Sequence, residues 1–318
     1  MNFKTSAIAL AVAGTVATPM AAQADLYASA RIGIENVDTG GISDLRVRSF
    51  GSRFGVRSET DLGNGMTGFG RYEWDVDFHD SDSGGNVQDG ITMRHRYVGL
   101  KGDFGSVTVG QAYHTFYNHV VGPLDNPWWG SGYYMVNYRG RTDNAISYAG
   151  TFGAVSIGAT AYFLHESEEE APDQLELAGS FGIGDMTLGI ALQNTASDTA
   201  HGSAGTDDDI LGITLHGISF GMVSMGFGYQ QQEDDSSIVA DFGIGNAYVH
   251  VELGSADADS ASSTSGDDED KTLVTLGYTQ SLGRKTTAYY ELVSRDADTG
   301  DSDDDATILR AVLKYDIE

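Results

Sequence analysis

The residues that could carry chemistry in this chain do not form a catalytic pattern. The motifs H-E-x-x-H and G-x-x-x-x-G-K-[ST] are absent, and no cysteine is present to act as a nucleophile or metal ligand. The eight histidines are scattered. His114 and His119 lie five residues apart, and this spacing is weak support for a metal site. We therefore expect no catalytic residue, no metal and no cofactor.

An aromatic segment at 112–136 differs in composition from the other long polar stretches. It has one acidic residue, Asp125, and two stiffening prolines, Pro123 and Pro127, whereas the other stretches are rich in aspartate. This composition favours a segment packed inside the protein over one in solvent. Alternatively, its aromatic residues could form a girdle at a membrane interface. Those residues are Tyr113, Phe116, Tyr117, Trp128, Trp129, Tyr133 and Tyr134.

The charge of the chain excludes some functions. The sequence has 46 acidic and 18 basic residues, a formal net charge of −28, which argues against a nucleic-acid-binding protein. Acidic runs at 257–270 and 296–305 are typical of solvated loops. Neither the calcium-binding nonapeptide repeat nor an EF-hand loop occurs. Loose divalent binding at a loop rim and adaptation to a saline habitat are both compatible with this acidity.

The elements that must position these residues are β-strands. Residues 154–164 alternate strictly, with Val155, Ile157 and Phe163 on one face and Thr160 and Tyr162 on the other. Residues 66–76 and 309–316 repeat the pattern. Such strands run about ten residues, the length that crosses a bilayer when tilted, whereas soluble strands average about five or six. The pattern favours a transmembrane sheet.

The connectors between the strands alternate between two kinds. Seven are tight and glycine-rich, at 61–65, 103–106, 150–153, 182–185, 217–219, 243–246 and 281–284. Eight are longer and mostly acidic, near 36–48, 77–90, 112–136, 165–173, 196–208, 230–236, 255–270 and 295–305. Fifteen connectors join sixteen strands. We predict an all-β fold, a closed antiparallel barrel with short periplasmic turns and long acidic extracellular loops.

The N-terminus reads as a secretory signal peptide. Lys4 supplies the positive charge, residues 7–17 form a small apolar stretch, and Ala22-Gln23-Ala24 matches the A-x-A cleavage pattern. We expect residues 1–24 to be removed on export and residues 25–318 to form the barrel.

Several spaced segments resemble, in the right order, motifs of the Gram-negative general diffusion porins. They are residues 25–27, 52–57 with 61–65, 96–105 with 107–111, and 141–148. The resemblance covers roughly residues 25–163, and the second half is similar in strand rhythm and length only. One departure is the C-terminus, Tyr315-Asp316-Ile317-Glu318, which lacks the terminal aromatic residue that the family's assembly machinery recognises.

The resemblance implies a trimer of sixteen-stranded barrels, each with its third long loop folded into the lumen. Residues 112–136 hold that place, so the implied constriction loop contains Asp125, Tyr113, Phe116, Tyr117, Trp128 and Trp129. Facing it, the family carries a basic wall. Motif position suggests Arg53, Arg94 and Arg141, and strand parity adds Arg31, Arg57 and Arg71.

These arginines could also pair with carboxylates inside the barrel, and both roles can hold at once. The candidates are Glu73, Asp75 and Asp125. Because Arg94, Arg96, Val98 and Leu100 would share one face of a regular strand, we expect a bulge or a strand end near Arg94.

The implied function is an outer-membrane channel for passive diffusion of small hydrophilic solutes and ions. The implied partners are outer-membrane lipid, lipopolysaccharide and two further copies of the chain. A substrate-specific outer-membrane channel is an alternative, and an outer-membrane barrel enzyme or a purely structural barrel are weaker ones.

Overall fold

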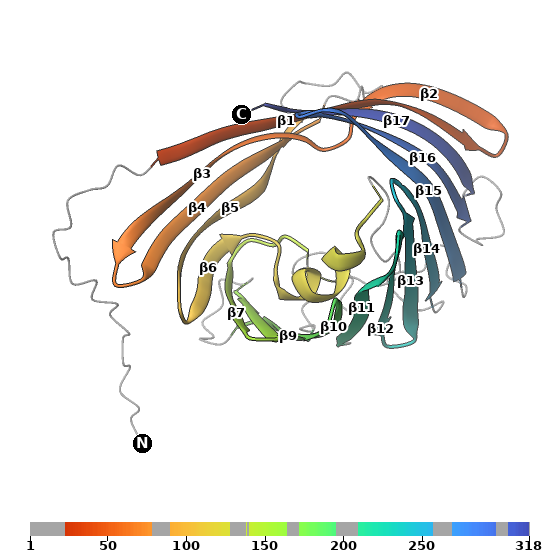
Figure 1. The fold of residues 1–318 in the computed structure, drawn as a ribbon. Helices are drawn as coiled ribbons and strands as arrows, with labels where there is room; N and C mark the ends of the chain where they lie inside the picture. Colours follow the sequence, from red (N-terminus) through yellow and green to blue (C-terminus); the bar gives the residue numbers. More distant parts are fainter. Residues whose placement is uncertain are drawn as a thin grey trace.

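The computed structural model describes residues 23–77, 90–127, 138, 140–163, 172–194, 209–256, 269–296 and 305–317. These residues form β-strands almost throughout, with one short helical segment inside the ring of strands (Figure 1). Among them, no helix is long and apolar enough to cross a membrane. The strands are β1 (Gln23–Thr39), β2 (Ile42–Ser49), β3 (Ser52–Gly63), β4 (Met66–Val76), β5 (Ile91–Gly102), β6 (Gly105–Gln111), β7 (Ala145–Phe152), β8 (Val155–Tyr162), β9 (Gln174–Ile183), β10 (Met186–Gln193), β11 (Ile210–Phe220), β12 (Val223–Gln232), β13 (Asp235–Ile244), β14 (Ala247–Ala256), β15 (Glu269–Gly283), β16 (Thr286–Asp296) and β17 (Ala306–Ile317).

The sheet closes into a barrel. Apart from β2 and β3, strands adjacent in sequence pair antiparallel, and the last strand, β17, pairs with the first, β1, from Ala28↔Ile317 to Thr39↔Ala306. Closure removes both sheet edges, which a membrane sheet requires. The predicted all-β antiparallel barrel is confirmed.

The predicted number of sixteen strands is also confirmed, because β2 and β3 are two parts of one barrel strand. Both pair with β1, β2 along Ile32–Thr39 and β3 along Gln23–Ser29. Only Phe50 and Gly51 separate them, and Gly51 has a φ of 71°. One residue more on this strand than on β1 spans the break, which is the geometry of a β-bulge.

The alternation expected from the sequence is present and is inverted relative to a soluble protein. On β8, Val155 and Ile157 are 40% and 41% exposed, whereas Thr160 and Tyr162 are 1% and 0% exposed. Large apolar side chains on the other strands are likewise exposed, and many polar ones are buried. The apolar face therefore lies on the outside of the barrel and the polar face inside, as in a membrane barrel.

Three predicted connectors differ from the structure. Near 36–48, the structure has a tight turn instead of the predicted long loop. β1 and β2 are joined by Gly40–Gly41, where both glycines adopt positive φ, and the acidic residues on either side belong to the strands. Near 230–236, a similar turn at residues 233–234 joins β12 and β13, where Glu233 adopts positive φ. Gly217 is at a bulge in β11, and the turn itself is at residues 221–222.

The expected long loops near 77–90, 165–173, 196–208, 255–270 and 295–305 fall mostly outside the described residues. The other tight turns are as predicted, for example at residues 64–65 and 245–246, where Asn64, Gly65 and Gly245 adopt positive φ.

The connector after β6 enters the barrel. Its helical part comprises η2 (Tyr117–Val121) and η3 (Gly122–Leu124). The first contacts β9, β10 and β11, and the second contacts β11, β12 and β13. We call described residues 112–127 the inner loop. Figure 1 shows this segment within the ring of strands.

Candidate functional site

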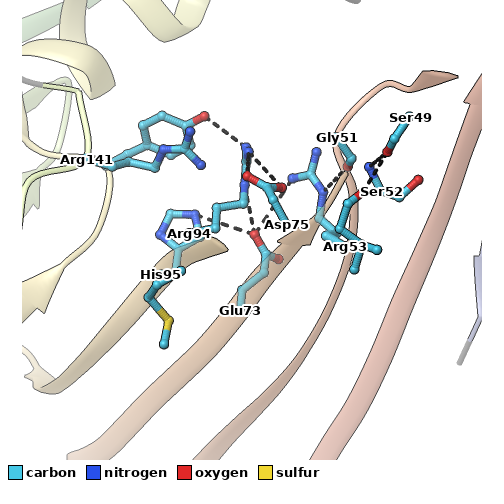
Figure 2. A network of polar contacts seen from close by, with 12 residues as sticks. Ser49, Gly51, Ser52, Arg53, Glu73, Asp75, Arg94, His95 and Arg141 are labelled. Atoms are coloured by element: carbon cyan, nitrogen blue, oxygen red, sulfur yellow. Dashed lines mark hydrogen bonds and ion pairs between the residues drawn. The ribbon is translucent and has the colours of Figure 1, made fainter. Parts of the chain in front are cut away.

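The centre of the basic wall is a buried carboxylate, Glu73 on β4. Its side chain is 0% exposed and accepts a hydrogen bond of 2.9 Å from the Tyr27 hydroxyl. Arg94 Nε lies 2.9 Å from one carboxylate oxygen and Arg53 Nη1 lies 3.9 Å from the same atom. Arg71 pairs with the other oxygen. Figure 2 shows Arg53 and Arg94 converging on Glu73 and Asp75 from different strands.

The bulge expected near Arg94 is present. Glu73 pairs with His95 and Trp74 pairs with Met93, so Arg94 is the extra residue on β5. This bulge turns its side chain to the lumenal face, where it also contacts Asp75 at 3.2 Å. A regular strand would point Arg94 and Arg96 the same way. Instead Arg96 lies on the outer face, paired with Asp143.

Arg141 joins the wall through an aromatic ring of the inner loop. Its guanidinium carbon lies 5.0 Å from the centre of the Tyr113 ring, a cation–π distance. Arg94 Nη2 donates a 3.1 Å hydrogen bond to the Tyr113 hydroxyl. One buried guanidinium nitrogen of Arg141 has no hydrogen-bond partner among the described residues. Tyr113 therefore connects the inner loop to the arginines of the basic wall.

The three arginines expected from strand parity also lie on the lumenal face. Arg71 Nε donates a 2.6 Å hydrogen bond to Tyr27, and Arg31 Nε donates one of 3.1 Å to Ser29. Arg57 is more exposed and lies 3.7 Å from Asp25 near the start of β1. Arg53 and Arg71 thus pair with Glu73, and Arg94 pairs with both Glu73 and Asp75.

A tyrosine crossing explains how Tyr27 on β1 reaches Glu73 on β4. The intervening strand β3 carries Gly55 at that point, and an added Cβ there would lie 2.6 Å from the Tyr27 hydroxyl oxygen. A side chain at residue 55 would block the tyrosine. A second crossing of the same kind takes Tyr248 over Gly277 to Glu291. Sequence alternation alone does not reveal either crossing.

The inner loop presents different side chains to its two sides. One apolar cluster is formed by Ala191, Ile210 and Val239 of the barrel together with four buried side chains of the loop, Phe116, Val120, Val121 and Leu124. The exposed polar residues of the loop are Asn118, Asp125 and Asn126. Phe116, expected among the constriction residues, therefore faces the wall rather than the lumen, because the apolar ring finds a partner surface there.

Asp125 and the two loop tyrosines form a group on the lumenal side. Tyr117 stacks on Tyr113 with ring centres 3.8 Å apart and donates a 2.9 Å hydrogen bond to Asp125. Burial and the nearby Asp125 carboxylate raise the pKa of Tyr117, so it stays a neutral donor. Trp128 and Trp129 lie outside the described residues.

A row of glycines forms the seat for the loop. Gly189 on β10 faces the carbonyl of His119 so closely that a Cβ would overlap with it. A Cβ at Gly212 would lie 2.6 Å from the Phe116 ring, and one at Gly158 would lie 3.0 Å from both His119 and Thr115. Only glycine allows the loop backbone to approach the wall this closely.

Polar contacts also fasten the loop to the wall. His114 Nε2 lies 2.6 Å from the Thr142 carbonyl, and His119 Nδ1 lies 2.6 Å from Ser180 Oγ. The two imidazoles thus contact different parts of the barrel, the segment before β7 for His114 and β9 for His119. Burial lowers the pKa of both histidines, the Thr142 contact opposing this for His114. Within the described residues, no three histidine, aspartate or glutamate side chains are grouped to hold a metal ion.

A buried carboxylate beneath the loop escapes sequence analysis. Glu176 on β9 is 0% exposed and accepts a 2.9 Å hydrogen bond from the backbone N–H of Phe116. It accepts a second, of 2.7 Å, from the Tyr162 hydroxyl. Strand parity could have placed Glu176 on the lumenal face, but no local signal pairs it with a residue 60 positions earlier.

A second charged network lies on β1, β2, β16 and β17. Arg310 contacts Glu35 at 2.7 Å and Glu291 at 3.4 Å, and Arg48 contacts Glu35 at 3.1 Å. Two arginines face two glutamates, so this network is close to neutral. By contrast the group of Arg53, Arg71, Arg94 and Arg141 contains two carboxylates, Glu73 and Asp75, so these six side chains carry a net charge of +2.

This arrangement produces an electric field across the lumen. The basic wall carries an excess of positive charge, and the exposed Asp125 on the loop is negative. Charges that face each other across a low-dielectric passage orient polar solutes and disfavour apolar ones.

Comparisons with known proteins agree with this architecture. A family model described as Gram-negative porin matches residues 7–316. The major outer membrane protein P.IB of Neisseria meningitidis serogroup A is 37% identical over 125 residues, which are 34% of this chain and 33% of that protein. A monosaccharide porin of Halomonas sp is 27% identical over 210 residues, 58% of this chain and 57% of that protein. The chain thus spans about a third of the length of the first curated relatives it matches.

Solved structures share the fold at low sequence identity. The anion-selective porin from Comamonas acidovorans superposes with a TM-score of 0.71 at 18% identity, covering 93% of this chain and 100% of that one. OmpF of Salmonella typhi, in complex with daunomycin, gives a TM-score of 0.70 at 14% identity, covering 92% and 97%. At these identities the likeness supports the barrel fold alone.

Proposed function

Because the chain belongs to the Gram-negative porins, we propose that it is a channel for passive diffusion of small hydrophilic solutes and ions. Membership in this family places it in the outer membrane. The observation that carries the proposal is the inner loop, seated inside a closed barrel opposite an arginine wall. A loop held there would narrow the lumen without filling it, which suits a channel selective by size and charge.

Conductance in a planar bilayer tests the proposal directly. We expect purified protein to insert with discrete steps of conductance and to pass small neutral solutes in a liposome-swelling assay. Correctly folded, heat-modifiable protein that inserts without conductance would contradict the channel function.

We further propose that the channel is a homotrimer and that its outer surface contacts membrane lipid and lipopolysaccharide. Solved porin neighbours include a trimer form. The exposed apolar band suits contact with acyl chains and with a second copy. Closure in three equal steps under voltage would support the trimer, and single-step closure would oppose it.

A substrate-specific channel is the second candidate. It is favoured by the similarity to a monosaccharide porin of Halomonas sp. Saturable uptake of monosaccharides, with competition between them, would favour this candidate over unspecific diffusion. No catalytic function is proposed, since the chain belongs to a porin family.

We also propose that residues 1–24 are a cleaved signal peptide. In the barrel, Gln23 and Ala24 pair with Glu59 and Ser58, and cleavage would make Asp25, opposite Arg57, the first residue of β1. Mass spectrometry of outer-membrane protein should therefore find Asp25 as the N-terminal residue.

A further inference from the structure

The apolar contact between the inner loop and the barrel stabilises the docked loop but does not by itself define the position of the loop along the barrel. Phe116, Val120, Val121 and Leu124 pack on Ala191, Ile210 and Val239. Apolar burial is non-directional, and glycines along the seat offer few side chains to interlock with the loop. Directional contacts must therefore set where the loop lies along the wall, and His114, His119 and Glu176 make such contacts.

Glu176 makes a directional contact of the required kind. Its carboxylate accepts from the N–H of Phe116, in the first turn of the helical segment, where backbone N–H groups lack partners within the helix. A hydrogen bond to an ionised carboxylate is stronger than one between neutral groups. The donor is a backbone atom, so the bond fixes the main chain of the loop rather than one rotamer.

The far side of Glu176 is itself fixed to the wall. The second carboxylate oxygen accepts from the Tyr162 hydroxyl at 2.7 Å, and Tyr162 is 0% exposed on β8. A buried carboxylate needs such hydrogen bonds to offset its desolvation. The Glu176 carboxylate is therefore fixed by two strands, β8 through Tyr162 and β9 through its own backbone, and it in turn fixes the loop.

The lumenal group follows directly in the chain. Tyr117 comes next after Phe116, stacks on Tyr113 and donates to Asp125. Tyr113 in turn accepts from Arg94 on the basic wall. A displacement of the Phe116 main chain thus moves the aromatic pair and the one acid that face the pore.

We propose that Glu176 is the positioning residue of the pore: its buried carboxylate fixes the inner loop on the wall and thereby sets the width of the passage. The proposal rests on the channel function proposed above. Glu176 does not touch the passing solute and acts only through the loop.

The test compares single-channel conductance and open-channel noise of matched variants. Glu176→Ala removes the acceptor and should raise mean conductance about 1.5-fold, with increased noise as the loop fluctuates. Glu176→Gln keeps an acceptor for the Phe116 N–H and should stay near wild type. Glu59→Ala is the control, because Glu59 is an exposed carboxylate paired with Lys101 and not with the loop.

An engineered crosslink separates positioning from loss of charge. Thr115 Oγ1 and Thr160 Oγ1 lie 2.8 Å apart between loop and wall, and the chain has no cysteine of its own. Thr115→Cys with Thr160→Cys, added to Glu176→Ala, should restore wild-type conductance and low noise when oxidised and lose them when reduced.

The outcomes distinguish this inference from the channel proposal. A wild-type protein that does not conduct contradicts the channel function itself. A conducting wild type with an unchanged, correctly assembled Glu176→Ala variant overturns the role of Glu176. If the alanine variant does not assemble, the Glu176→Asp variant is measured instead. It keeps a carboxylate, but its shorter side chain should not reach the Phe116 N–H, so conductance and noise should rise. Unchanged conductance and noise in that variant would also overturn the role.

Discussion

At the residue scale, Arg94 is the side chain that links most of the site. It contacts Glu73 and Asp75 on the wall and Tyr113 on the loop, and its lumenal position depends on a bulge in β5. Arg57 lies on the same face but is more exposed, and it forms an ion pair with Asp25 rather than with Glu73 or Asp75. Substituting each arginine in turn therefore compares a central position of the basic wall with a peripheral one.

We predict that Arg94→Gln shifts selectivity toward cations more than Arg57→Gln does. Removing Arg94 lowers the net charge of the wall from +2 to +1, and the potential in a narrow, low-dielectric passage responds strongly to one charge. The cation-to-anion permeability ratio, obtained from reversal potentials in a KCl gradient, should rise about twofold for Arg94→Gln. Equal shifts in both variants would contradict a special position of Arg94.

The two loop histidines predict a pH dependence. Burial lowers the pKa of His114 and His119, so the docked loop binds fewer protons than a released loop, whose histidines titrate near about 6.5. Docking of the loop is therefore most stable above about pH 6.5, the pKa of a free histidine. It weakens as the pH falls from there toward the lowered pKa values of the docked histidines.

We expect open-channel noise to increase as the pH drops below about 6.5. His119→Asn should flatten part of this dependence, because the amide can still bond Ser180 but does not titrate. Noise that is independent of pH between neutral and mildly acidic conditions would show that these histidines do not control docking.

At the element scale, the seat on β8, β10 and β11 and the loop are complementary surfaces. Gly189 lies against the backbone carbonyl of His119, which cannot move without moving the loop. Gly179 on the neighbouring strand β9 has room for a methyl group, because the closest atom to an added Cβ, the Ser156 carbonyl oxygen, lies at an ordinary contact distance of 3.7 Å. One methyl group at these two positions should have very different consequences.

We predict that Gly189→Ala destabilises the docked loop by about 1–3 kcal/mol, the usual cost of overpacking. Conductance and noise should rise, while the barrel itself remains folded, as judged by circular dichroism and heat modifiability. Gly179→Ala should behave like wild type. A Gly189→Ala variant with unchanged conductance would mean that the loop does not press on the wall at this point.

The elements also show which parts of the site can be predicted from sequence. Period-two alternation places Arg53 and Arg71 on the lumenal face, and the bulge at Arg94 follows from a conflict in that alternation. Composition separates the inner loop from the acidic loops. Asp125 is exposed, whereas Phe116 turns to the wall, because composition does not tell which face of an inserted segment is apolar.

The remaining part depends on contacts distant in sequence. Glu176 meets Phe116 across 60 residues, and Tyr27 meets Glu73 across 46, over a glycine on a third strand. Such meetings require the strand register around the closed barrel, which alternation does not specify. Likewise, the turns at residues 40–41 and 233–234 depend on backbone conformation, and acidic composition there wrongly indicates long loops.

At the scale of the whole molecule, two charge distributions act over different distances. The chain has a net charge of −28, and much of its acid lies in the segments expected to form the extracellular rim. The basic wall, with its excess of arginine over Glu73 and Asp75, lies inside the barrel beside the inner loop. We therefore expect the mouth of the proposed channel to favour cations and the basic wall to favour anions.

We predict that the cation preference is modest at low salt and weakens or reverses as salt rises. The Debye length is about 30 Å at 0.01 M, so the acidic rim then concentrates cations at the mouth, and about 3 Å at 1 M, where only charges bordering the passage are felt. Reversal potentials in KCl gradients at several mean concentrations measure this change. In an Arg53→Gln, Arg94→Gln double variant the reversal should disappear at high salt, while low-salt selectivity changes little. Anion preference already at low salt would show that the wall, and not the rim, governs entry.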